Sequence, residues 1–143
     1  MMKKHTVMII RTILLLILAG VSCTKEHSFE KLVEKQLYKQ FQHSTLCNYH
    51  YILLIPNGGC TGCVQQAENY FLHHQNDKET LFIFTNFASR KSLSIRLGKE
   101  SLNRSNVWLD HDNSLYFPKC AESVYPCVIF LEKGKVNHFT NLD

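Results

Sequence analysis

The stretch PNGGCTGCVQQAENYF, residues 56–71, places two cysteines two residues apart between a glycine turn and a helix-like segment. Apolar side chains recur at helical spacing from Val64 to Phe71, so Cys60 is expected where a helix begins. Unpaired backbone N–H groups and the helix dipole favour a thiolate at such a position. Cys63 lies about one helical turn later and is placed to resolve a mixed disulfide formed at Cys60.

An apolar segment lies on each side of this stretch. Residues 49–56 (YHYILLIP) and residues 80–87 (TLFIFTNF) are rich in β-branched and aromatic side chains, which indicates strands buried on both faces. Strand, helix and strand in this order predict a βαβ unit, in which a right-handed crossover joins two parallel strands. The sequence therefore predicts an α/β fold.

Four further segments complete the expected architecture. Residues 28–43 carry apolar side chains at helical spacing and predict an amphipathic helix that docks on the body of the protein. Residues 88–100 alternate in apolar character, but their length and connectivity favour a helix. Residues 106–113 predict a short strand, and residues 126–140 (PCVIFLEKGKVNHFT) predict a hairpin that turns at a Lys-Gly pair.

The N-terminal residues have the pattern of an export signal. A basic start, an apolar run over residues 13–19 and small residues before Cys23 predict a lipoprotein signal peptide over residues 1–22, with lipidation at Cys23. The apolar run is short for a membrane-spanning helix. A conventionally cleaved signal and an uncleaved anchor are the alternatives. The rest is expected to form a tether and helix over residues 23–45 and one domain over residues 46–143.

The net charge of +4 comes mainly from this leader. Three of the 16 Lys and Arg residues lie in it, which leaves 13 basic against 12 acidic residues elsewhere. A nearly neutral domain offers no electrostatic basis for binding nucleic acid, and no nucleic-acid partner is expected.

The cysteine pair after a strand, together with the later segment SVYPCVIFLEKGKV, resembles the thioredoxin-like superfamily. The chain is most similar to its exported thiol–disulfide branch, called TlpA-like or redoxin-like, over about residues 48–140. The resemblance implies a three-layer α/β fold with a central mixed sheet and flanking helices. It also implies that Pro126 is a cis-proline, with Tyr125 and Cys127 as candidate accessory residues. The segment VWLDHDNSLYF resembles the strand and turn that this branch inserts before that proline.

For function, the resemblance implies thiol–disulfide exchange. Cys60 would attack a substrate disulfide, Cys63 would resolve the mixed disulfide, and Pro126 would shape the groove where the backbone of the partner docks. The expected partners are envelope proteins with thiols or disulfides, and a redox protein that supplies or accepts electrons. The lipid anchor would hold the protein at the membrane, and no cofactor is implied.

Four departures from the family pattern bear on this expectation. Gly59 stands where the family usually has an aromatic residue, and Thr61-Gly62 separates the cysteines where a proline is common. Leu54 stands where thioredoxins carry a buried acid that assists proton transfer. The chain stops at Asp143, which leaves no room for the usual C-terminal helix. One face of the sheet is therefore expected to rely on the amphipathic helix or on a partner.

Other interpretations of the pair stay open. The loop GGCTGC also resembles the soft-metal loop of heavy-metal-associated domains, and two thiolates suit Cu(I). The alternative is therefore a lipid-anchored Cu(I)-binding protein without catalysis, with Cys60 and Cys63 as ligands. Copper carriers of the thioredoxin fold add a histidine, for which His111 and His138 are candidates, although solvated histidines are the simpler interpretation. A static disulfide and a degenerate thioredoxin-like module that only binds partners also remain.

Three more cysteines lie in the predicted domain. Cys127 either brings a third thiol near Cys60 or packs in the core, as free cysteines often do. Cys47 and Cys120 are candidates for a structural disulfide, which persists outside the cytoplasm, but the sequence does not fix the pairing.

Overall fold

Residues 28–142 are described by a computed structural model. The predicted signal peptide over residues 1–22 and the predicted lipidation site Cys23 lie outside these residues. None of the helices within residues 28–142 combines the length and the apolar character needed to cross a membrane.

Helices and strands alternate along the described part of the chain. Their order is α2 (Phe29–Gln40), α3 (His43–Leu46), β1 (Tyr51–Pro56), α4 (Thr61–His74), β2 (Thr80–Thr85), α5 (Arg90–Leu97), α6 (Lys99–Leu102), β3 (Val107–Leu109), the 3₁₀ helix η1 (Ala121–Val124), β4 (Cys127–Glu132) and β5 (Lys135–Asn141).

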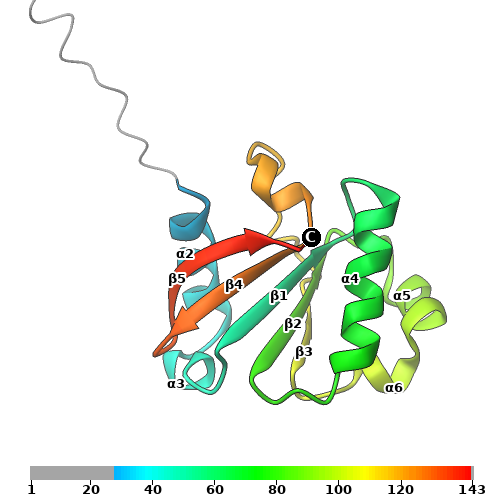
Figure 1. Ribbon diagram of the computed structural model, residues 1–143, viewed down its shortest axis with the longest axis horizontal. Coiled ribbons are helices and arrows are strands. Elements are labelled where there is room, and N and C mark those ends of the chain that lie inside the picture. The colour runs from blue at the N-terminus through cyan, green and yellow to red at the C-terminus, as the bar shows by residue number, and fades with distance from the viewer. Residues whose placement is uncertain (1–27, 143) are drawn as a thin grey trace, which may run out of the picture.

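The strands form one mixed sheet in the order β3-β2-β1-β4-β5 (Figure 1). β1, β2 and β3 are parallel, β4 runs antiparallel to β1, and β5 runs antiparallel to β4. The predicted βαβ unit is confirmed as β1-α4-β2. The predicted hairpin is confirmed as β4-β5, whose turn residues Lys133 and Gly134 have positive φ values of 51° and 75°, as a tight two-residue turn requires.

Helices cover both faces of the sheet and complete a three-layer α/β fold of the thioredoxin-like class, as predicted. On one face, α2 and α3 bury apolar side chains against the sheet: Phe29, Val33, Leu37 and Leu46. On the other face, α4, α5 and α6 do the same: Ala67, Phe71, Leu93, Leu97 and Leu102. Among the described residues no helix follows β5, which packs against α2.

The two central strands supply both cores. Along β1, Leu54 faces the core under α2 while its neighbour Leu53 faces the core under α4. Along β2, Ile83 and Phe82 divide in the same way. Since all positions of β2 and all but Tyr51 of β1 are buried, their apolar runs are continuous rather than alternating. Each fully buried side chain of this size contributes about 1.5–3 kcal/mol relative to an exposed one.

The ambiguous segment at residues 88–100 contains the helix α5, as its length and connectivity suggested. Ser89 caps the helix, since its Oγ accepts a hydrogen bond from the N–H of Ser92 at 3.1 Å. Leu93 and Leu97, four residues apart, are buried, whereas Ile95 is 76% exposed. The apparent alternation therefore came from a solvent-facing isoleucine between two core leucines.

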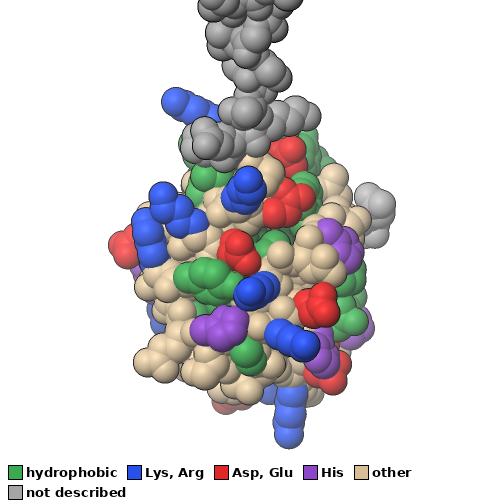
Figure 2. Space-filling model, turned by 90° about the vertical axis from the view of Figure 1, so that its left-hand side faces the viewer, with side chains coloured by type: hydrophobic (Ala, Val, Ile, Leu, Met, Phe, Trp, Pro, Cys, Tyr) green, Lys and Arg blue, Asp and Glu red, His purple; other side chains and the backbone are tan. Residues whose placement is uncertain are grey.

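Charged side chains of both signs are mixed on the surface near α2 and β5. On the face turned to the viewer in Figure 2, Lys and Arg side chains lie among Asp and Glu side chains. Neither sign forms a continuous patch on this face of the described residues.

Candidate active site

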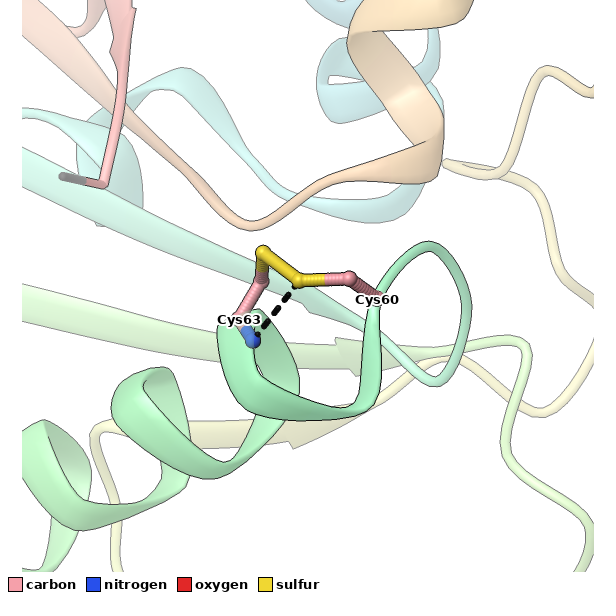
Figure 3. Close-up of a disulfide and its surroundings, with 2 residues drawn as sticks. All are labelled: Cys60 and Cys63. Carbon is pink, nitrogen blue, oxygen red and sulfur yellow. Dashed lines mark hydrogen bonds between the residues drawn. A yellow bond between two sulfur atoms is a disulfide. The ribbon is translucent and has the colours of Figure 1, made fainter.

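Cys60 and Cys63 form a disulfide at the start of α4 (Figure 3). Their Cα atoms are 5.3 Å apart, a separation typical of disulfides. Cys60 is the N-cap of α4, and its Sγ accepts a hydrogen bond from the backbone N–H of Cys63 at 3.1 Å. Cys60 is exposed and Cys63 is half-buried. The sequence thus placed the pair correctly at a strand-to-helix turn, and Cys60 is the more accessible residue.

The turn before Cys60 requires glycine at position 59. Gly59 has a φ of 75°, which L side chains rarely adopt. A Cβ at this position would lie 2.8 Å from the carbonyl oxygen of Val124 and 2.9 Å from a ring carbon of Tyr125. The ring of Tyr125 therefore lies directly against the residue that precedes Cys60. It supplies an aromatic surface beside the turn, where the resemblance to the thioredoxin-like superfamily had implied an aromatic residue at position 59 itself.

The segment that carries Tyr125 and Pro126 passes beside the disulfide, between η1 and β4 (Figure 3). No peptide bond within residues 28–142 is cis, so the expectation of a cis-proline at Pro126 is wrong. Tyr125 is extended, with φ −108° and ψ 150°, a conformation favoured before proline. The carbonyl oxygen of Pro126 accepts a hydrogen bond from the N–H of Leu142 at 3.1 Å, which extends the β4-β5 ladder by one pair.

A buried apolar pair lies where the resemblance to thioredoxins had implied a buried acid. Leu54 on β1 lies opposite Cys127 on β4 in the antiparallel register, and both are fully buried in the core under α2. Burial raises the pKa of the Cys127 thiol to about 12, so this thiol is protonated at neutral pH. Of the two placements that the sequence left open for Cys127, the structure shows the one in the core.

We expect this burial to make the protein less stable at high pH. In the unfolded chain the Cys127 thiol ionises above its ordinary pKa of 9.0, whereas the folded protein retains the proton up to about pH 12. The contribution of the thiol is complete below pH 9 and is lost between pH 9 and 12, at up to about 1.4 kcal/mol per pH unit. Denaturant unfolding at several alkaline pH values should show a steeper fall for the wild type than for Cys127→Ala. Equal slopes would contradict the prediction.

Cys47 and Cys120 do not pair. Cys47 follows α3, and Cys120 immediately precedes η1; these two elements lie at opposite ends of the sheet (Figure 1). Both cysteines are free thiols, and so is Cys127. The candidate disulfide between Cys47 and Cys120 is therefore wrong, because the fold separates the two residues.

The two candidate histidine ligands lie in aromatic contacts. The ring of His111 packs edge-on to Phe87, with ring centroids 5.4 Å apart, and His138 stacks on Phe130 at 4.2 Å. Within residues 28–142, no three His, Cys, Asp or Glu side chains gather in a way that could hold a metal ion. Among these described residues, a soft metal at this site would have the two sulfurs of the reduced pair as its ligands.

A pocket beside Cys60 contains an ion pair that the sequence interpretation missed. Glu68 on α4 is buried and accepts hydrogen bonds from Arg96 on α5, the shortest of them 2.8 Å long. The burial of Glu68 could have been predicted from the sequence, whereas its pairing with Arg96 could not. Val64, Ala67, Glu68 and Phe71 share the spacing of an apolar helix face, so a charge at position 68 indicated a buried partner. Arg96 comes from another helix, and its pairing depends on the tertiary fold.

A second buried acid, Asp110, lies at the end of the edge strand β3. Asp110 follows β3 and is 1% exposed. It accepts hydrogen bonds from the hydroxyl of Thr85 and from the backbone N–H groups of Ser114 and Leu115. Asp110 thereby fixes the beginning of the segment that leads to η1 and Tyr125.

These features define an α/β protein with a disulfide-bonded cysteine pair at a strand-to-helix turn, an arrangement compatible with the thioredoxin-like fold. Comparisons of the chain with protein-family models, with curated proteins and with solved structures found no significant match.

Proposed function

We propose that this protein is an exported, lipid-anchored thiol–disulfide oxidoreductase of the thioredoxin-like kind. The observation that carries the proposal is the Cys60–Cys63 disulfide at the N-terminus of α4, directly after the β1 strand and its glycine turn. The exposure of Cys60 supports its role as the attacking residue. The leader pattern that ends at Cys23 supports export and lipid anchoring.

In the reduced protein, the Cys60 thiolate attacks one sulfur of a substrate disulfide. A bond forms between the two sulfurs, the substrate disulfide breaks, and the departing substrate thiolate takes up a proton. The Cys63 thiolate then attacks the Cys60 sulfur, which closes the disulfide of the protein and releases the second substrate thiolate. Two electrons pass from the protein to the substrate, and the reverse sequence oxidises a substrate dithiol.

The local geometry suits this division of roles. The N–H of Cys63 that donates to the Cys60 sulfur in the disulfide would also stabilise a negative charge on that sulfur after reduction. Leu54 offers no carboxylate to accept the proton of Cys63. Because Cys63 is half-buried rather than enclosed, water is the remaining acceptor for that proton.

Serine variants of the two cysteines test the assignment. We expect Cys63→Ser to accumulate mixed disulfides with substrate proteins, since nothing resolves the bond formed at Cys60. Cys60→Ser should accumulate none, and the double variant gives the background. The measurement is non-reducing electrophoresis with mass spectrometry of the adducts. Equal trapping by the two single variants would contradict the roles given to Cys60 and Cys63.

The reduction potential of the pair decides the direction of transfer. A value near −270 mV, about that of thioredoxin, would indicate a reductase, and a value near −120 mV, about that of DsbA, would indicate an oxidase. Equilibration of the protein with glutathione buffers of graded ratio measures this potential.

A further inference from the structure

A pocket of about 310 Å³ opens beside Cys60. Its walls come from the loop between β1 and α4, from the first two turns of α4 and from Arg96 on α5. Gly59 and Thr61, which precede and follow Cys60 in the chain, both line the pocket. Neither Cys60 nor Cys63 lines the pocket, so a peptide joined to Cys60 in a mixed disulfide would reach it across Gly59 or Thr61.

In the ion pair of this pocket, the guanidinium group of Arg96 is more exposed than the carboxylate of Glu68. Nε of Arg96 donates to both carboxylate oxygens of Glu68 at 3.2 and 3.3 Å, and Nη2 donates to one of them at 2.8 Å. The side chain of Glu68 is 11% exposed, whereas that of Arg96 is 40% exposed. The hydrogen bonds to Glu68 leave Nη1 of Arg96 unused. Its donors are held in a fixed orientation, because the guanidinium group is planar and two of its nitrogens are bound.

We propose that this pocket binds the carboxylate of an acidic residue close to the reacting cysteine of a peptide or protein substrate. The inference rests on the proposed function. Among the lining residues, all in the described part of the chain, Arg96 is the only cation and Glu68 is the only acid. Asn57 and Gln65 add neutral polar groups. A pre-organised guanidinium group forms charge-assisted hydrogen bonds with a carboxylate, which a neutral side chain does not match.

The length of the pocket sets the distance between the acid and the cysteine. Thr61 and Glu68 are separated by two helical turns, or about 10 Å along α4. An extended peptide advances about 3.3 Å per residue, so the acid is expected about three residues from the reacting cysteine.

The test compares two peptide disulfides that differ only in having Glu or Gln three residues from the cysteine. The pre-reduced protein transfers two electrons to each peptide disulfide, forming its own Cys60–Cys63 bond and two peptide thiols. Each rate is divided by the rate of the same peptide with dithiothreitol, which removes the effect of Glu on the peptide sulfur itself. We expect the normalised rate of the Glu peptide to be roughly three- to tenfold higher.

Two variants of the ion pair distinguish recognition from a structural role. Arg96→Gln should abolish the preference for the Glu peptide. Glu68→Gln retains an oxygen that can orient Arg96 but removes the opposing charge, so it should increase the preference. Both variants break the ion pair, and a purely structural role would move both in the same direction. Arg90→Gln is the matched control, because Arg90 lies on the same helix, is hydrogen-bonded to Asn103 and does not line the pocket.

Equal normalised rates for the two peptides would overturn the inference while leaving the proposed function intact. Changes of preference in the same direction in Arg96→Gln and Glu68→Gln would do the same. If the reduced wild-type protein reduced neither peptide disulfide and the oxidised protein oxidised neither pair of peptide thiols, the proposed function would be overturned, and the inference with it.

Discussion

Replacing Asp110 with alanine is expected to lower the free energy of unfolding by about 3–5 kcal/mol. One carboxylate oxygen accepts hydrogen bonds from Thr85 Oγ1 and the Leu115 N–H, each at 2.8 Å. The other oxygen accepts from the N–H and the hydroxyl of Ser114 at 2.9 and 3.0 Å. Alanine would leave buried donors without acceptors, and each such donor costs about 1–3 kcal/mol. Urea unfolding monitored by fluorescence measures the loss.

Two further substitutions provide an intermediate case and a control for this prediction. Asp110→Asn preserves the shape but replaces one accepting oxygen by a donor, so an intermediate loss of about 1–3 kcal/mol is expected. Asp112→Ala lies in the same loop at an exposed position and should change stability by no more than about 0.5 kcal/mol. If Asp110→Ala were as stable as Asp112→Ala, the buried network would not hold this edge of the sheet.

The architecture was predictable because local hydrophobic patterns in the sequence indicate each of its main elements. The continuous apolar runs of β1 and β2 reflect burial on both faces, and the amphipathic pattern of α2 reflects burial on one side. The turn of the β4-β5 hairpin was visible as a Lys-Gly pair. The position of the cysteine pair was predictable for the same reason, because a strand, a glycine turn and a helix define the place of Cys60, whereas the sequence left open whether the pair forms a disulfide or binds a metal.

The surroundings of the cysteine pair depend on contacts between distant segments, and these were mostly not predictable. Arg96 reaches Glu68 from another helix. Asp110 accepts hydrogen bonds from residues of β2 and of the loop that follows β3. The expected cis-proline at Pro126 came from a resemblance rather than from any local requirement of the sequence. The contact between Tyr125 and Gly59 joins segments more than sixty residues apart and is likewise invisible in a local pattern.

Gly59→Ala is expected to lower the free energy of unfolding by about 2–4 kcal/mol. Part of the loss is the left-handed conformation, since φ is 75° at this residue. The rest is the contact of the new Cβ with the backbone oxygen of Val124 at 2.8 Å, which cannot be relieved by rotating a side chain. Gly62→Ala, between Cys60 and Cys63 and three residues after Gly59, is the matched control. Its Cβ would meet nothing within 4 Å, and alanine in a helix should raise stability by up to about 1 kcal/mol.

A double-mutant cycle with Tyr125→Ala separates the two contacts of Gly59. The added Cβ would also lie 2.9 Å from the Tyr125 ring, so removing the ring should reduce the loss caused by Gly59→Ala by at least about 0.5 kcal/mol. The remaining loss belongs to the backbone conformation and to Val124.

Exchange activity should fall with Gly59→Ala even where the protein stays folded, because the segment that carries Tyr125 must move away from Cys60. If Gly59→Ala unfolded at the same denaturant concentration as the wild type, this segment would not constrain the turn. Glycine at position 59 would then be a preference of the sequence rather than a requirement of the site.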